Sequence, residues 1–427
     1  MESTLKTFWG ISSFQILAMF RRGLFYSYLS IYLRHYLGLS VTETTFFTTF
    51  PMILNIIFQT FVWGGISDKY QLRRTLIVWG ELLAGIGTVI VWYAHTWTTN
   101  TTMAGYIIIA GLSVIEIFWS MSNIGWSALI SDIYRLKQRT DVQGKLASLG
   151  GIGRYIGVWT GGLLYDGLGR QYDGWGFESG ALFFVAAGVM FLSIIPMYFV
   201  PEGGAQKTRS PLQPTDNIIN PTYSRLFIGF LVAMLLVNFG RNSVALILTQ
   251  YLVLESGLAV SSLSLSYIVN TQSIAMVLSG LIAGRLAAKI GDATVLMTGT
   301  ICAVVSLVII GITFNMPMIY FSNFIRGVSE VVISASAYTF ASRLIPPEKR
   351  GRLFGMFNAT FFLSWGVGAT LFTAPIIDIM ILKGYTQVFS YQVAFLSAAV
   401  LTMAGLGVLA VVMVAAGKHR YRKDAGD

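Results

Sequence analysis

Several charged residues interrupt long apolar stretches of the sequence, where a charge is costly. A charged side chain near the middle of a bilayer costs several kcal/mol, so it is expected to face a partner or a polar cavity. A guanidinium keeps its charge and can hold a carboxylate or a phosphate through two hydrogen bonds. A desolvated carboxyl group can exchange protons near working pH. The six residues are Arg21, Arg22, Glu116, Arg241, Arg326 and Glu330.

Arg22 and Arg241 are the leading candidates for binding an anion, because they stand near the centres of two different apolar runs. Tyr26 follows Arg22 by one helical turn, and Asn238 precedes Arg241 by three residues, so each pair shares a helix face. We expect these four residues to bind substrate, with the anion clamped between the two halves of the chain.

Glu116 and Glu330 are candidates for carrying protons, and Arg21 and Arg326 complete the charge network. The alternative is that all of these residues form structural ion pairs and contact no substrate. Four basic and two acidic residues leave two positive charges that pairing cannot neutralise, which favours anion binding. Arg154 either faces the cavity or makes a structural contact. Four further ionisable residues are interpreted as members of polar pairs at the membrane–water interface: His35, Glu81, Asp132 and Asp166.

The elements that must position these charges are transmembrane helices. The chain has 427 residues, 55% hydrophobic and only 11% charged, whereas soluble domains carry about a quarter charged residues. A spanning helix needs roughly 20 apolar residues. The apolar runs predict an all-α polytopic protein with twelve spans, at residues 8–35, 43–65, 74–95, 103–132, 142–165, 178–200, 223–252, 259–283, 293–314, 316–343, 352–377 and 386–416.

The distribution of Lys and Arg predicts the orientation. Twenty-one of them fall in loops and ends on one side of the predicted spans, against three on the other side. Because cytoplasmic loops carry the excess, both termini are expected in the cytoplasm of a plasma (inner) membrane. This also explains the net charge of +10 without a nucleic-acid partner. The predicted organisation is a six-helix bundle (1–200), a cytoplasmic linker (201–222), a second six-helix bundle (223–416) and a basic tail (417–427).

An internal repeat relates the two halves. Residues 20–41 align with residues 239–260 at an offset of 219, and this places Arg22 opposite Arg241. A second match, at an offset of 211, relates the fifth span to the eleventh. Duplicated six-helix halves in parallel orientation are typical of secondary transporters, with the substrate site near the midplane. The matched pairs include Phe20/Phe239, Arg22/Arg241, Tyr32/Tyr251, Gly38/Gly257, Arg139/Arg350, Gly144/Gly355 and Gly157/Gly368.

The loop between the second and third spans carries a motif. It contains Gly64, Asp68, Lys69, Arg73 and Arg74, and it resembles the loop signature of the major facilitator superfamily, with Gln71 where the signature has a second glycine. The resemblance covers almost the whole chain and implies the twelve-helix fold of that superfamily, with the first, fourth, seventh and tenth helices lining the cavity.

Asp68 is expected to act in gating with Gly64, Lys69 and Arg73. A carboxylate at the cytoplasmic end of the second span can sit against the N-terminus of a neighbouring helix, where it would stabilise one access state by about 1 kcal/mol. The alternative is a solvated surface charge. Gly64 and Gly65 favour the gating role because they allow helices to approach closely.

The fifth span contains a second motif. Gly153, Gly157, Gly161 and Gly162 resemble the superfamily's antiporter motif, but Val158 stands where that motif has a proline. The glycines favour a proton-coupled multidrug antiporter, whereas the missing proline and the basic cavity disfavour it.

The sequence therefore predicts a secondary transporter of a small organic or phosphorylated anion, coupled to protons or working by anion exchange. No nucleotide-binding or hydrolase motif is present, so no enzyme activity, cofactor or metal is expected. With one cysteine, an intramolecular disulfide is impossible. The expected partners are the substrate, protons and the lipid bilayer, with the protein as a monomer. Beside the multidrug antiporter, the alternatives are a polytopic membrane enzyme and a non-transporting sensor.

Overall fold

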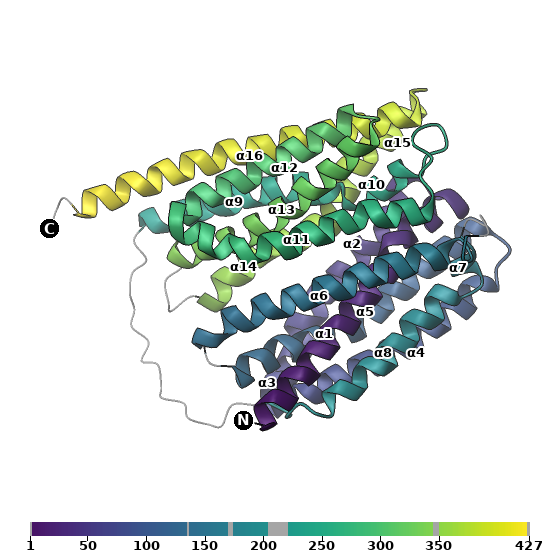
Figure 1. The fold of residues 1–427 in the computed structure, drawn as a ribbon, viewed down its shortest axis with the longest axis horizontal. Coiled ribbons are helices and arrows are strands. Elements are labelled where there is room, and N and C mark those ends of the chain that lie inside the picture. The colour runs from purple at the N-terminus through teal and green to yellow at the C-terminus, as the bar shows by residue number, and fades with distance from the viewer. Residues whose placement is uncertain (1, 135, 170–173, 204–220, 345–349, 425–427) are drawn as a thin grey trace. The chain divides into compact units, whose positions relative to one another are not determined.

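The computed structural model describes residues 2–134, 136–169, 174–203, 221–344 and 350–424, and within these ranges the chain is helical without strands (Figure 1). The helices fall on the predicted spans, so the all-α prediction is confirmed. The first half contains α1 (Glu2–Ile31), α2 (Val41–Phe58), α3 (Gly64–Tyr70), α4 (Arg74–Thr96), α5 (Thr101–Ile133), α6 (Leu136–Tyr165), α7 (Trp175–Glu178) and α8 (Ala181–Met197).

The second half repeats this series of helices. It contains α9 (Pro221–Ser243), α10 (Ala245–Leu252), α11 (Ser262–Ile290), α12 (Asp292–Ile312), α13 (Met316–Leu344), α14 (Arg350–Gly368), α15 (Ala374–Leu382) and α16 (Gln387–Asp424). Within the described ranges the π-helical turns η1 (Tyr32–Tyr36), η2 (Gln59–Trp63) and η4 (Ala369–Thr373) continue α1, α2 and α14. Most of the predicted linker, at 204–220, lies outside the described residues.

Eight helical segments among the described residues are long and apolar enough to cross a membrane. The apolar helix α8 is shorter, and α1, α6 and α13 contain more polar residues. Together these elements match the twelve predicted spans. The eight segments are Val41–Ser67, Arg74–Thr96, Thr101–Ile130, Arg225–Leu252, Ser262–Ile282, Asp292–Ile312, Met356–Leu382 and Gln387–Ala416.

The contacts divide the chain into two compact units. The first unit comprises residues 1–209 and 248–273, and the second comprises residues 210–247 and 274–427. Residues 248–273 belong to the first unit because their side chains and backbone form hydrogen bonds with it. These hydrogen bonds join Ser30 and Thr249 at 2.9 Å, Gln250 and Thr44 at 2.9 Å, His35 and the Gln250 carbonyl at 3.2 Å, Asn270 and the Tyr155 carbonyl at 3.1 Å, and Ser262 and Asp166. The predicted assignment of all of 223–416 to one bundle stays a prediction.

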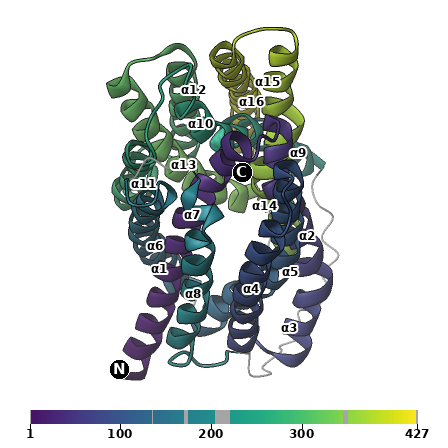
Figure 2. The same ribbon diagram turned by 90° about the vertical axis from the view of Figure 1, so that its right-hand side faces the viewer.

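The same helix pairings recur in both units, as the internal repeat predicts. In the first unit α1 packs against α6 and α8, and α4 packs against α5 and α8 (Figure 2). In the second unit α9 packs against α14 and α16, and α12 packs against α13 and α16. Each α1 pairing thus has an α9 counterpart, and each α4 pairing has an α12 counterpart. Similar apolar faces on repeated helices account for this, because each must bury the same stripe.

Close approach of α1 and α6 depends on the glycines of the fifth span. A Cβ atom on Gly153 would lie 2.2 Å from the Ile16 carbonyl oxygen, and one on Gly157 would lie 2.0 Å from that of Phe20. Backbone atoms cannot move aside as a flexible side chain can. The glycines that resemble an antiporter motif therefore form a close helix–helix contact of the kind that small residues allow in membranes.

A helix break follows the predicted anion-binding residue of the second unit. Helix α9 ends at Ser243, and α10 begins at Ala245. The break leaves the Ser243 carbonyl free to accept a hydrogen bond from Thr373, at 3.0 Å, in the π-helical turn η4. Irregular backbone inside a membrane protein requires such a partner, and it often occurs at functional sites. The break sets the end of the helix that carries Arg241.

Gln71 adopts the left-handed conformation between α3 and α4, with φ 56° and ψ 30°. This region costs most L-residues roughly 1–2 kcal/mol, which explains why the family signature has glycine there. Gln71→Gly is therefore expected to raise the free energy of unfolding by about 1 kcal/mol in a denaturation measurement. Gln71→Ala is the matched control, since it loses the same side-chain contacts but keeps a Cβ. Equal stability of the two variants would contradict the strain.

Candidate functional site

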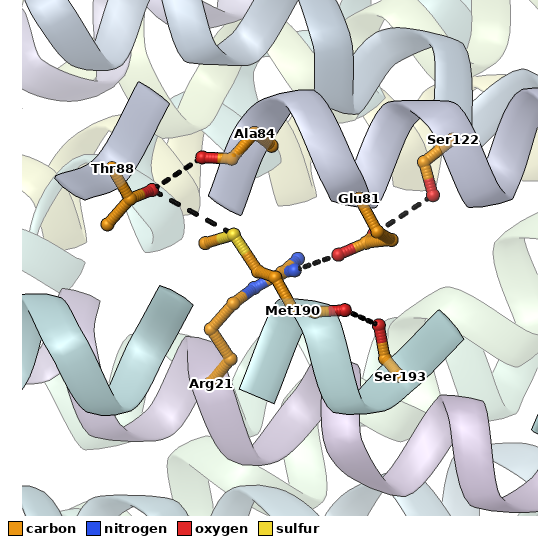
Figure 3. A network of polar contacts seen from close by, with 7 residues as sticks. All are labelled: Arg21, Glu81, Ala84, Thr88, Ser122, Met190 and Ser193. Atoms are coloured by element: carbon orange, nitrogen blue, oxygen red, sulfur yellow. Dashed lines mark hydrogen bonds and ion pairs between the residues drawn. The ribbon is translucent and has the colours of Figure 1, made fainter. Parts of the chain in front are cut away.

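Arg21 and Glu81 form a buried ion pair inside the first unit (Figure 3). Their side chains come from α1 and α4, and the residues are 4% and 2% exposed. Ser122 of α5 donates to the other Glu81 oxygen at 3.0 Å, and the Arg21 guanidinium carbon lies 4.4 Å from the Trp119 ring centroid. Three helices thus share one charged network. Glu81 does form an ion pair, as predicted, but the pair lies in the interior of the unit and not at the predicted membrane–water interface.

Arg22 follows Arg21 on the chain but has a different environment. Its side chain is exposed, and it makes no ion pair with a residue that the structure describes. Glu116 is half-buried and accepts a hydrogen bond from Asn55 of α2 at 2.5 Å. Arg22 and Arg21 act on the Glu116 carboxylate only through space. Arg21, Arg22 and Glu116 thus lie near one another in the first unit, and their roles in binding and proton coupling stay a prediction.

Tyr26 lies one turn beyond Arg22, within an aromatic group. Its ring centroid is 6.2 Å from that of Phe47, 6.0 Å from that of Trp119 and 5.7 Å from that of Phe25. The side chain is half-buried. The two arginines and Glu116 also act on it electrostatically. The predicted neighbours Arg22 and Tyr26 thus share one region of the first unit.

Arg241 is buried in the second unit, with 7% of its surface exposed. Its Nε donates to Asn238 Oδ1 at 3.1 Å, and Asn238 in turn donates to Thr360 Oγ1 at 3.2 Å. The guanidinium carbon lies 5.7 Å from the Phe361 ring centroid. Asn238 therefore orients Arg241, as their predicted spacing on one helix face allows.

A small cavity of about 10 Å³ lies beside Arg241, close to the room for one water. It joins residues of four helices, α9, α12, α13 and α14. Arg326 and Glu330 of α13 line it, as does Asn242, which sequence reasoning missed and whose amide donates to Ser364 at 2.7 Å. The lining residues are Arg241, Asn242, Ala303, Ser306, Leu307, Arg326, Ser329, Glu330 and Trp365.

The predicted gating loop contains a second polar cluster. Arg73 is 6% exposed, donates from Nε to Asp132 at 3.0 Å and also donates to Ser67. Lys69 is exposed, with its Nζ 5.1 Å from the Tyr70 ring centroid. The Gly64 backbone belongs to α3, whereas the Asp68 side chain lies outside the described residues.

Glu202 occupies the N-terminus of α4, a place of the kind predicted for Asp68. Its carboxylate accepts from the backbone amides of Arg73, at 2.9 Å, and Thr75, at 3.0 Å, and it pairs with Arg74 Nε at 3.2 Å. A carboxylate is stabilised there by the free amides and by the helix dipole. Sequence reasoning missed Glu202, since it lies more than a hundred residues away. The sequence feature that could have indicated Glu202 was its place as an acidic residue just after the sixth predicted span.

These features define a class of protein. Apolar helices form two units with the same packing, and each unit buries ionisable side chains where a bilayer would make them costly. That plan is typical of secondary transporters. The chain has the architecture of a polytopic membrane protein of this kind.

Comparison with known proteins identifies the family. The sequence profile of the Major Facilitator Superfamily matches residues 11–369 and 230–426, so the chain belongs to that superfamily. An uncharacterized MFS-type transporter of Mycobacterium tuberculosis is 28% identical over 200 residues, which are 45% of this chain and 27% of that protein. The chain thus spans about a quarter of the length of that relative. The multidrug resistance protein MdtG of Salmonella schwarzengrund is 24% identical over 306 residues, 70% of each chain.

Solved structures show the same fold. The nucleoside transporter NupG superposes with a TM-score of 0.71 at 14% identity, covering 97% of this chain and 99% of that one. A bacterial homolog of the human lysosomal transporter Spinster, in an inward-facing and occupied conformation, gives a TM-score of 0.70 at 12% identity, covering 97% and 98%. At these identities the likeness concerns the fold alone, and it confirms the fold that the loop motif implied.

Proposed function

We propose that this transporter carries a small organic or phosphorylated anion by alternating access. The observation that carries the proposal concerns the repeat-related pair Arg22 and Arg241. Neither arginine makes an ion pair with a residue in the described part of the chain. Arg241 stands in the segment Arg225–Leu252, which is long and apolar enough to cross a membrane, and Arg22 stands in the interior of α1. A guanidinium kept there without a carboxylate is best explained by an anion that arrives from outside the protein.

Structural pairing predicts a different arrangement. In that alternative each arginine neutralises Glu116 or Glu330. Arg21, instead, pairs with Glu81, and Glu116 accepts a hydrogen bond from Asn55. Arg22 acts on Glu116, and Glu330 acts on Arg241, only through space, so neither guanidinium is bonded to a carboxylate of the described residues. We infer that both remain able to bind an anion. Tyr26 and Asn238 are proposed to support substrate binding beside them.

Glu116 and Glu330 are the proposed sites of proton coupling, if the anion moves with protons and not by exchange. Glu116 is half-buried near two arginines, and Glu330 lines the cavity with Arg326. A carboxyl group close to guanidinium groups changes their attraction for an anion when it takes up a proton. Binding of proton and anion would then be linked.

The loop from Gly64 to Arg73 is the proposed gate. The ion pair of Arg73 with Asp132 joins the start of α4 to the end of α5. Asp68 and Lys69 belong to α3 in the same segment and are proposed to make and break contacts as the access state changes. We further propose a monomer in a plasma (inner) membrane, with both termini in the cytoplasm, because of the excess of basic residues in loops on that side.

Arg22→Lys and Arg241→Lys test the anion site. Each change keeps the charge but removes the planar fork, so affinity for organic anions is expected to fall by about 1–3 kcal/mol, with folding retained. Binding is measured by thermal shift of detergent-solubilised protein against a panel of carboxylates and phosphate esters. Arg34→Lys is the control, since Arg34 donates to the Leu39 carbonyl, outside the proposed site. Unchanged affinity in both lysine variants would end the proposal.

Multidrug efflux is the second candidate. The observations in its favour are the similarity to the multidrug resistance protein MdtG and the glycines of α6 that resemble an antiporter motif. The same thermal-shift panel separates the candidates when it includes lipophilic cations. Stabilisation by cations alone would favour drug efflux, whereas stabilisation by anions that depends on Arg22 and Arg241 would favour anion transport.

A further inference from the structure

In the cavity of the second unit, Arg241 and Ser329 each present a donor for which the described residues offer no acceptor. Arg241 uses Nε to bond Asn238, and its two Nη groups donate to no described residue. Ser329, from α13, lines the same cavity and is 2% exposed, yet its hydroxyl makes no hydrogen bond with a described residue. Buried polar groups are almost always paired with protein or a bound species. Two such donors on different helices therefore indicate a ligand between them.

The charge of the cavity indicates the sign of that ligand. Arg241 and Arg326 contribute two positive charges, and Glu330 contributes one negative charge. One further negative charge would neutralise the group. In the first unit, by contrast, the buried Arg21 is already neutralised by Glu81. In the second unit Glu330 acts on Arg241 through space, but no carboxylate of the described residues forms an ion pair with it.

The size of the cavity limits the ligand to a single small group. About 10 Å³ accommodates approximately one water. A whole organic acid does not fit, but a halide ion or one oxygen of a carboxylate does. A neutral water would satisfy the hydrogen bonds and leave the positive charge uncompensated.

We propose that this cavity binds one small anionic atom, held by Arg241 Nη and Ser329 Oγ. The atom is either a free halide ion or one carboxylate oxygen of the transported anion. Binding of a carboxylate oxygen of the transported anion rests on the proposed function, whereas binding of a free halide ion does not. In both cases Glu330 limits the site to one negative charge, because a second anion would face its carboxylate.

A halide titration tests the site. The melting temperature of the purified protein is measured in sodium bromide against sodium methanesulfonate at equal ionic strength, since methanesulfonate is too large for the cavity. We expect a saturable rise with bromide and about a tenfold weaker apparent affinity in Ser329→Ala. Ser336→Ala is the matched control, because Ser336 is equally buried on α13 and bonds its own helix at Val332. An identical bromide response in Ser329→Ala and the parent would overturn the proposal.

Anomalous scattering from bromide gives a readout that needs no variant. A bromide peak within hydrogen-bond distance of Arg241 Nη and Ser329 Oγ supports the site, and a cavity that holds only water at saturating bromide overturns it. Formate, the smallest carboxylate, distinguishes the two sources. Displacement of the bromide by formate indicates a carboxylate oxygen, whereas persistence of the peak indicates a free halide. If Arg22→Lys and Arg241→Lys both leave organic-anion affinity unchanged while the parent protein shows the bromide peak, only the proposed function fails.

Discussion

Glu81→Leu is expected to lower the free energy of unfolding by about 3–5 kcal/mol. The change removes the carboxylate that neutralises Arg21, which is 4% exposed and cannot reach water without disrupting the packing of α1, α4 and α5. An uncompensated buried charge is far more costly than a lost hydrogen bond. Ser122 would also lose its acceptor. The measurement is denaturant unfolding of the detergent-solubilised protein.

The double variant Arg21→Met, Glu81→Leu is the control for this prediction. It removes both charges and keeps similar volumes, so its stability is expected to return to within about 1 kcal/mol of the parent. A double variant as unstable as Glu81→Leu would show that shape, and not charge, explains the loss. A single variant as stable as the parent would show that the pair contributes nothing to the fold.

Gly157→Ala is expected to destabilise the protein by about 3 kcal/mol, because the new methyl group would lie 2.0 Å from the Phe20 carbonyl oxygen. The obstacle is backbone of α1, so relief requires the two helices to move apart. That movement would shift the neighbouring residues Arg21 and Arg22 as well. Melting temperature measures the first effect, and the anion affinity of the surviving protein measures the second.

Gly188→Ala is the matched control. Gly188 lies in the interior of α8, and a Cβ atom there meets no atom within 4 Å. Alanine favours helix over glycine, so this variant is expected to be as stable as the parent or slightly more stable. If both alanine variants behave alike, the close approach of α1 and α6 has no role in stability.

The positions of the helices could be predicted from the sequence because each apolar run must form its own backbone hydrogen bonds in a membrane. The predicted spans 74–95 and 293–314 correspond to α4 (Arg74–Thr96) and α12 (Asp292–Ile312). The internal repeat could also be detected in the sequence, and the helix pairings recur in both units. The break at Val244 was not predicted. Gly240, Asn242 and Ser243 stand directly before it, but polar residues at this place were interpreted as lining a site on a continuous helix.

The charged residues show the limit of this reasoning. The sequence predicted which charges matter, but not their partners. Glu116 and Glu330 were the expected acids, whereas Arg21 pairs with Glu81, which sequence reasoning placed at an interface. Glu81 lies 60 residues from Arg21 on a different helix. A contact between such distant residues depends on how the helices rotate and pack.

Arg21 and Arg22 illustrate the physical reason. The sequence alone determined that two adjacent guanidiniums stand near mid-depth of the first helix, and that Arg22 has a counterpart in Arg241. Successive residues of an α-helix point about 100° apart, so only one of the two could face α4. The packing of α1 against α6 and α8 fixes that rotation. It places Arg21 against Glu81 and leaves Arg22 exposed, and this difference was decided by the tertiary structure alone.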